Sequence, residues 1–211
     1  MEKKLIIFDM DGVLFDTIPY AKKVFIERHP GVTEEMYNEI HTGNFHEEAS
    51  KYSHLKIKET REEAEKFKTN YSENKKKFAL PFNGVKKLLN DLYNEGFFLV
   101  LNTNAYNRNC IPLLENSGLA NMFDFIASAE VSKDKIEKFK LIKDKYKAER
   151  GNVLFVTDAL GDVRDADLAD VPTVAVTWGV HDKSFFEREK HSNLIGVVDT
   201  IEELGKFIEK Y

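Results

Sequence analysis

Short, continuous apolar runs alternate with segments of helical periodicity along most of this 211-residue chain. The runs lack the in-and-out alternation of a half-exposed strand, which indicates strands that are buried on both faces. The segments between them carry apolar residues three and four positions apart, and several end at a glycine. This order predicts a parallel α/β sheet covered by helices. The predicted strands span residues 5–8, 97–103, 123–127, 153–157 and 173–178.

Residues 17–80 break this alternation, because they hold several helical patterns and no convincing strand. The segment is too long for one crossover helix, which needs about a dozen residues. We therefore predict a small all-helical domain inserted after the first strand, with a core made of residues 1–16 and 81–211. The lysine run 75–77 is interpreted as a solvated face. One apolar stripe, interpreted as the core of the insert, comprises Ala64, Phe67, Tyr71 and Phe78.

Composition limits the class of protein further. Hydrophobic residues make up 42% and charged residues 32%, which is typical of a soluble globular chain. The net charge of -5 argues against nucleic-acid binding through a general positive field. The apolar runs are far shorter than the roughly 20 residues that span a bilayer, and charged Glu2 and Lys3 follow Met1, so we expect no membrane segment and no signal peptide. Cys110, the single cysteine, fits a reducing compartment, and the cytoplasm is the expected location.

The first candidate site follows the first predicted strand, where Asp9 and Asp11 precede Gly12. Two carboxylates at a strand end can both turn into the crevice where open α/β sheets bind their ligands. Gly12 allows the sharp backbone bend that must follow. An isolated Asp-x-Asp-Gly is about as often a solvated turn, so this motif needs support from other strand ends.

Three further segments place polar side chains at or after strand ends. Thr103 and Asn104 end one apolar run, Lys133 precedes a helical segment, and another run delivers Asp158, with Asp162 four residues later. Each of these alone is more typical of a strand stop or an exposed side chain. Because parallel strands end at one edge of a sheet, all of them would converge. Crowded carboxylates repel one another, and such an oxygen-only cluster suits Mg²⁺, whose sites often also hold a phosphate.

The same residues, in this order, resemble the four motifs of the haloacid dehalogenase-like superfamily. The resemblance spans the chain and indicates the branch of phosphoglycolate phosphatase and β-phosphoglucomutase-like members. It reaches residues 172–179, which are similar to the segment after the last acidic motif in phosphoglycolate phosphatase-like members. It implies a Rossmann-like core with a helical cap inserted after the first motif. For the third motif we select Lys133 over Lys135, because Phe139 then falls where the following helix usually begins its apolar face.

The resemblance also implies roles for the matching residues. Asp9 would be the nucleophile that forms an aspartyl-phosphate, which divides one difficult displacement into two. Asp11 would protonate the leaving group and then activate water. Thr103 would bind the transferring phosphoryl group and Lys133 would offset its charge. The implied reaction is the magnesium-dependent hydrolysis of a small phosphorylated metabolite.

Mg²⁺ is the implied cofactor, and the substrate would also meet Gly12 and Asn104. In the fourth motif Thr157 replaces the usual glycine, which leaves open whether Asp158 or Asp162 is the direct ligand. The implied metal-binding residues are Asp9, Asp11, Asp158 and Asp162, with Asp11 contributing its main-chain carbonyl.

Other activities are less well supported. Dehalogenases lack the second acid of the first motif, whereas Asp11 is present. Phosphomutases of the family carry a histidine where this chain has Ala21, so a hydrolase is favoured over a mutase. A catalytically idle core that binds a partner protein would be expected to lack one of the acids. His41, Phe45 and His46 lie where related caps place a specificity loop, although such residues are more often structural.

Overall fold

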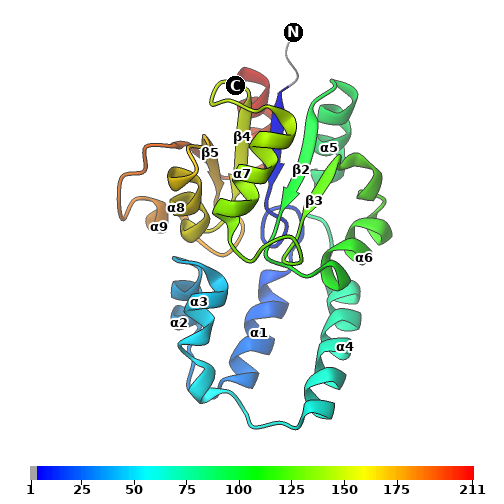
Figure 1. Cartoon of the computed structure of the whole chain (residues 1–211), viewed down its shortest axis with the longest axis vertical. Helices are drawn as coiled ribbons and strands as arrows, with labels where there is room; N and C mark the ends of the chain where they lie inside the picture. The colour runs from blue at the N-terminus through cyan, green and yellow to red at the C-terminus, as the bar shows by residue number, and fades with distance from the viewer. Residues whose placement is uncertain (1–3) are drawn as a thin grey trace.

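A computed structural model describes residues 4–211, and its centre is a sheet of six parallel strands in the order β3-β2-β1-β4-β5-β6 (Figure 1). This is the doubly wound order, in which ligands bind beyond the carboxyl ends of the strands. The predicted α/β, Rossmann-like class is confirmed. Glu2 and Lys3, which bear on the expected lack of a signal peptide, lie outside the described residues. The strands are β1 Leu5–Phe8, β2 Phe98–Asn102, β3 Phe125–Ala127, β4 Val153–Thr157, β5 Thr173–Val176 and β6 Leu194–Val198.

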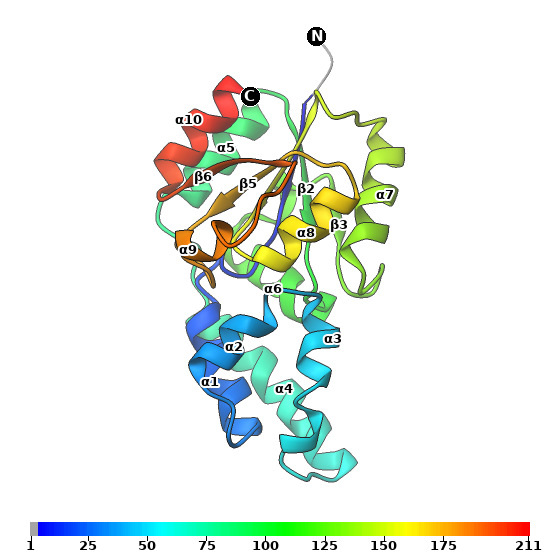
Figure 2. The same ribbon diagram turned by 90° about the vertical axis from the view of Figure 1, so that its left-hand side faces the viewer.

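Helices cover both faces of the sheet (Figures 1 and 2). Successive residues of the central strand β1 face opposite sides, so Ile6 belongs to a core with α5, α6 and α10 and Ile7 to a core with α7. All four residues of β1 are buried, which explains its continuous apolar run. In residues 4–211 no helix is both long and apolar enough to cross a bilayer. The covering helices are α5 Val85–Asn94, α6 Asn107–Ser117, η2 Ala120–Met122, α7 Lys135–Tyr146, α8 Leu160–Leu168, α9 Lys183–Phe186 and α10 Ile201–Lys210.

A second layer of helices, which we call the helical insert, lies at the carboxyl edge of the sheet (Figures 1 and 2). Thr60 and Glu63 form a reciprocal capping box that begins the longest of these helices, α4. The rings of Tyr20 on α1 and Tyr71 on α4 stack with centroids 5.4 Å apart. The predicted apolar stripe is not a buried core, however, because Phe78 is 64% exposed and its other residues are half-buried. The insert comprises α1 Ile18–Arg28, α2 Glu34–Ile40, α3 Phe45–Ser50, η1 Ser53–Leu55 and α4 Arg61–Phe78.

The two connections between the helical insert and the sheet run side by side. Phe15 and Pro81 form an antiparallel bridge, and Asp16 N donates to Leu80 O at 2.9 Å. Phe82 N donates to Leu14 O at 3.0 Å on the core side of that bridge. The chain therefore enters and leaves the insert at one place.

The strand pattern did not predict β6. This edge strand is only partly buried, and Gly196 interrupts its apolar run. The glycine is required by packing, because a Cβ there would lie 2.5 Å from a ring carbon of Phe207 on α10. The glycine that makes this packing possible also interrupts the apolar pattern by which a strand is predicted.

Candidate active site

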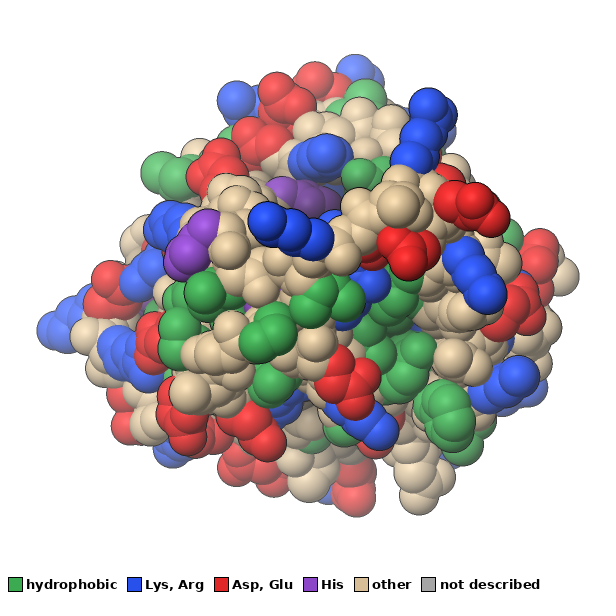
Figure 3. Space-filling view, turned by 90° about the horizontal axis from the view of Figure 1, so that it is seen from below, with side chains coloured by type: hydrophobic (Ala, Val, Ile, Leu, Met, Phe, Trp, Pro, Cys, Tyr) green, Lys and Arg blue, Asp and Glu red, His purple; other side chains and the backbone are tan. Residues whose placement is uncertain are grey.

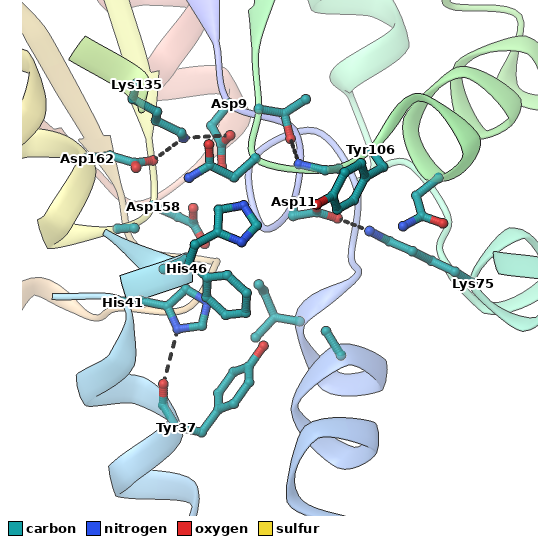
Figure 4. Close-up of a pocket in the computed structure, with 18 of the residues that line it drawn as sticks. Asp9, Asp11, Tyr37, His41, His46, Lys75, Tyr106, Lys135, Asp158 and Asp162 are labelled. Atoms are coloured by element: carbon teal, nitrogen blue, oxygen red, sulfur yellow. Dashed lines mark hydrogen bonds and ion pairs between the residues drawn. The ribbon is translucent and has the colours of Figure 1, made fainter. Parts of the chain in front are cut away.

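A cavity of about 260 Å³ lies between the carboxyl edge of the sheet and the helical insert (Figure 4). The core contributes acidic, amide, hydroxyl and lysine side chains, whereas the insert contributes mainly rings. This volume is at the small end for ligand pockets, so the cavity suits a small metabolite. Its lining includes Asp9, Asp11, Tyr37, His41, Phe45, His46, Tyr71, Lys75, Thr103, Asn104, Tyr106, Asn109, Lys135, Asp158 and Asp162.

Asp9 follows β1 directly and is 8% exposed. Its Oδ1 accepts a hydrogen bond from Lys135 Nζ at 2.8 Å, and the same Nζ donates to Asp162 Oδ2 at 2.6 Å. Burial raises the pKa of Asp9 to about 6, the Lys135 charge opposes the rise, and the neighbouring charges of Asp162 and Asp11 add to it. One buried lysine therefore holds two carboxylates at the end of the central strand.

The lysine in this position is Lys135, which corrects the expectation that Lys133 lies at the site. Asp134 caps α7 by accepting from Ile136 N at 2.7 Å, so Lys135 is the first residue of the helix. Lys135 is 2% exposed, whereas Lys133 precedes the cap and is exposed. Asp134 was the signal in the sequence, because Asp is a favoured N-cap and the residue after a cap begins the first turn.

Thr103 and Asn104 line the cavity where they were expected. Thr103 Oγ1 accepts from Ala105 N at 3.0 Å, which leaves the hydroxyl hydrogen free to donate. Lys138, fully buried beneath β2, donates to Thr103 O at 2.7 Å and to Asn104 Oδ1 at 2.8 Å. Because the Asn104 side-chain oxygen is bonded to Lys138, its NH₂ group points away from that lysine. Burial, reinforced by the charge of Lys135, lowers the pKa of Lys138 to about 7. No pattern in the sequence indicated that this lysine lies at the site.

Asp158 and Asp162 have different surroundings. Asp158 is 1% exposed and its Oδ2 accepts from Val180 N at 2.7 Å. Burial first, and then the charge of Asp9, raises the pKa of Asp158. A Cβ on Gly12 would lie 1.9 Å from Asp158 Oδ2, so this glycine, which has a φ of +78°, makes room for the carboxylate. Gly12 was expected at the substrate, but it is not among the residues lining the cavity.

Asp162 Oδ2 accepts two hydrogen bonds, one from Lys135 Nζ at 2.6 Å and one from Thr157 Oγ1 at 2.7 Å. The threonine that departs from the usual glycine of the motif thus fixes Asp162. Across residues 4–211, no group of three or more His, Cys, Asp or Glu side chains is arranged as a complete metal site. Mg²⁺ commonly uses only one or two protein carboxylates together with water and substrate phosphate, so the neighbouring buried carboxylates of Asp9 and Asp158 fit that ion.

The helical insert supplies one cation, Lys75, to the acidic cluster. Lys75 Nζ lies 2.6 Å from Asp11 Oδ1, and its side chain is 4% exposed. The interpretation of residues 75–77 as a solvated face is therefore wrong for Lys75. Burial would raise the pKa of Asp11, but the charge of the adjacent Lys75 ammonium opposes the rise, and the pKa is lowered. Lys75 follows Tyr71 by four residues and thus shares its helix face, which was the available signal.

The helical insert also rests directly on the core. Gly161 N donates to His41 O at 2.9 Å, and a Cβ on Gly161 would lie 2.4 Å from Gly43 O. His181, fully buried, accepts from Leu160 N at Nδ1 and donates from Nε2 to Asn38 O, each at 2.9 Å. Both ring nitrogens of this histidine are thus used to join the two layers, and no sequence pattern indicated it.

Seen from the insert end, the surface mixes Lys and Arg with Asp and Glu and shows no extended patch of one sign (Figure 3). This face therefore shows no cluster of Lys and Arg of the kind that binds nucleic acids (Figure 3).

A doubly wound sheet that gathers buried carboxylates, a lysine and a hydroxyl at its carboxyl edge defines an α/β enzyme suited to phosphoryl groups. The chain matches the haloacid dehalogenase-like hydrolase family over residues 6–176 and belongs to that family.

Curated relatives of the chain are phosphatases. The chain is 26% identical to the phosphoglycolate phosphatase of Mesorhizobium japonicum, over 90% of this chain and 89% of that protein. It is 25% identical to the N-acetylmuramic acid 6-phosphate phosphatase of Pseudomonas aeruginosa, over 85% and 84% of the two chains. The crystal structure of a predicted phosphatase from Clostridium acetobutylicum shares the fold, with a TM-score of 0.77 at 20% identity over 100% of each chain. The predicted enzyme class, a hydrolase of the phosphatase type, is confirmed.

Proposed function

We propose that this phosphatase hydrolyses the monoester of a small phosphorylated metabolite, with Mg²⁺ and through an aspartyl-phosphate on Asp9. The observation that carries the proposal is the buried Asp9 carboxylate, held by Lys135 at 2.8 Å beside the cavity. The names of the curated relatives, whose substrates are small phosphate esters, support it. Cys110 is buried and free, which favours a reducing compartment, and we propose the cytoplasm.

In the first half-reaction, an oxygen of Asp9 attacks phosphorus and the ester P–O bond breaks. The hydroxyl of Thr103 and the amide of Asn104 donate to the phosphoryl oxygens, and Lys135 offsets their negative charge. Asp11 gives its proton to the departing alcohol oxygen. The incoming phosphate dianion raises the proton affinity of Asp11, so that the residue can carry a proton at this stage.

In the second half-reaction, water attacks the aspartyl-phosphate, Asp11 accepts the proton from water, and the bond between Asp9 and phosphorus breaks. Inorganic phosphate leaves and the Asp9 carboxylate is restored. The lowered pKa of Asp11 keeps it ionised after the alcohol departs, which suits a general base.

The proposed ligands of Mg²⁺ are the carboxylates of Asp9 and Asp158 and the main-chain carbonyl of Asp11. When bound, the ion would neutralise charge on the phosphoryl oxygens. Burial raises the pKa values of both carboxylates, and the charge of Asp9 adds to the rise at Asp158, so a bound divalent cation would relieve the cost of ionising them. Asp162 is proposed to hold Lys135 and not the metal, because its oxygen already accepts from Lys135 and Thr157.

The proposal is tested with p-nitrophenyl phosphate. We expect turnover with magnesium, loss of turnover in excess chelator, and loss of turnover in Asp9→Asn. A phosphorylated protein species, 80 Da heavier by intact mass after rapid acid quench, is expected in the wild type and absent in Asp9→Asn. Turnover that survives both chelator and Asp9→Asn would refute the mechanism. Formation of an isomeric sugar phosphate without release of phosphate would favour the mutase alternative, which Ala21 on the cavity lining argues against.

A further inference from the structure

Lys138, on α7, is a buried lysine without a carboxylate partner. It is fully buried, and its Nζ donates to Thr103 O at 2.7 Å and to Asn104 Oδ1 at 2.8 Å, which are both neutral oxygens. Within residues 4–211 no Asp or Glu forms an ion pair with it. Burial, reinforced by the charge of Lys135, lowers the pKa of Lys138 to about 7, so its surroundings disfavour the charged form. Packing alone rarely keeps a lysine in such a place, which points to a role in the site.

The contact with Lys138 fixes which way the Asn104 side chain points. An amide oxygen accepts hydrogen bonds, whereas an amide nitrogen donates them. The lysine nitrogen has enough hydrogens to donate to both of its oxygen partners whether it is charged or neutral. The oxygen of Asn104 therefore faces Lys138. The NH₂ group of Asn104 donates to no atom of residues 4–211, and because Asn104 is half-buried on the cavity lining, a bound group can reach it.

This orientation matters because phosphoryl oxygens accept hydrogen bonds. With its NH₂ group toward the cavity, Asn104 can donate to them, whereas an amide turned over would present its oxygen to negatively charged oxygens. Lys135 stands three residues before Lys138 on the same side of α7, and its Nζ lies 2.8 Å from Asp9 Oδ1. One helix therefore holds both the proposed nucleophile and the amide, which keeps their separation constant.

We infer that Lys138 is a positioning residue, which holds the Asn104 side chain with its NH₂ group toward the phosphoryl group of the substrate. The bond to Thr103 O anchors the lysine, and the bond to Asn104 Oδ1 prevents the amide from turning over. Lys138 is not among the described residues that line the cavity, so it acts through Asn104 and not by contact with the substrate. This inference rests on the proposed phosphatase function and adds a residue to it.

A double-mutant cycle tests this role. Lys138→Met removes the donors and nearly keeps the length of the side chain, and Asn104→Ala removes the amide. The cycle measures kcat/KM for p-nitrophenyl phosphate with magnesium, and the dissociation constant of inorganic phosphate, in the wild type, both single variants and the double variant. Each single variant is expected to lower kcat/KM by about tenfold or more and to weaken phosphate binding. In the Asn104→Ala background, Lys138→Met should lower kcat/KM by about threefold or less, because no amide remains to be positioned.

A lysine with a purely structural role would have the same effect in both backgrounds. Multiplicative losses in the cycle, or an unchanged kcat/KM in folded Lys138→Met, would overturn the inference while leaving the phosphatase function intact. Lys140→Met, the same change at an exposed lysine of α7, should change neither quantity. Melting temperatures near that of the wild type show that each variant is folded, and Lys138→Leu takes the place of Lys138→Met if the latter does not fold. Absence of all turnover by the wild type would overturn the proposed function, on which the inference rests.

Discussion

Replacing Asp9, the proposed nucleophile, by its neutral isostere asparagine should stabilise the metal-free protein. Asn at position 9 retains an oxygen that can accept from Lys135, and Lys135 keeps its pairing with Asp162 at 2.6 Å. The substitution removes one of several crowded charges. It also lowers the cost of ionising Asp158, whose pKa is raised partly by the Asp9 charge. Asp9→Asn is therefore predicted to unfold at higher denaturant concentration than the wild type, although it is expected to be inactive.

The size of the effect follows from the pKa of Asp9, which rises from an ordinary value of 3.8 to about 6. At about 1.36 kcal/mol for each pH unit, the ionised side chain destabilises the fold by about 3 kcal/mol relative to the protonated one. Because the folded pKa lies above the unfolded one, this contribution is absent below pH 3.8 and develops as the pH rises through about 6. The predicted gain for Asp9→Asn is thus about 1 to 3 kcal/mol at pH 7.5 and close to zero near pH 4.

Urea unfolding of both proteins in EDTA, at several pH values between 4 and 8, measures the difference directly. The exposed Asp144 provides a matched control, since Asp144→Asn should change the free energy of unfolding by no more than about 0.5 kcal/mol. Excess magnesium should stabilise the wild type more than Asp9→Asn and narrow the difference in stability, because the ion is proposed to bind the Asp9 carboxylate. A variant that is less stable than the wild type at pH 7.5 in EDTA, or a difference that does not depend on pH, would refute the reasoning.

Two further predictions use matched pairs of variants. Lys135→Met leaves buried carboxylates without their cation, so it should destabilise the protein by about 3 kcal/mol and lower kcat for p-nitrophenyl phosphate by about a thousandfold or more. Lys133→Met should change neither quantity, and equal effects of the two variants on urea unfolding and kcat would contradict the placement of Lys135. Gly161→Ala puts a Cβ 2.4 Å from a backbone oxygen of the helical insert and should lower kcat/KM about tenfold, because it holds the insert off the core. Gly151→Ala, whose Cβ meets nothing within 4 Å, should leave kcat/KM unchanged. Unchanged steady-state kinetics of a folded Gly161→Ala variant would show that this close approach is not needed.

The sequence predicts the core of this fold well, because burial on both faces of a central strand leaves no freedom of pattern. Ile6 and Ile7 face different helices and both must be apolar, so the run that holds them is unmistakable. An edge strand is less buried, so fewer of its residues must be apolar. In β6 the ring of Phe207 leaves no room for a side chain at Gly196, and this glycine interrupts the apolar run. The prediction of strands therefore missed β6, where a side chain of the neighbouring helix α10 determines which residue can stand at position 196.

The candidate site divides in the same way. Asp9 and Asp158 stand at the ends of buried strands, so the strand pattern alone places them. Lys75 depends on a packing between layers that no local pattern encodes, although its place on an apolar helix face marks it as unusual for a lysine. The choice of Lys133 over Lys135 failed because the spacing to a later apolar residue was given more weight than the helix cap.

The paired connections of the helical insert bear on how such enzymes diversify. With Asp16 N bonded to Leu80 O at 2.9 Å and Phe15 bridged to Pro81, the insert hangs from two adjacent points of the core. A short turn could join those points, and a different helical segment could be exchanged at the same junction with little effect on the sheet. The half of the cavity that is proposed to meet the alcohol could thus change by recombination, while the residues proposed to meet the phosphate are inherited unaltered. Substrate range and reaction chemistry would then evolve as separate modules, and grafting inserts between relatives becomes a practical route to new specificity.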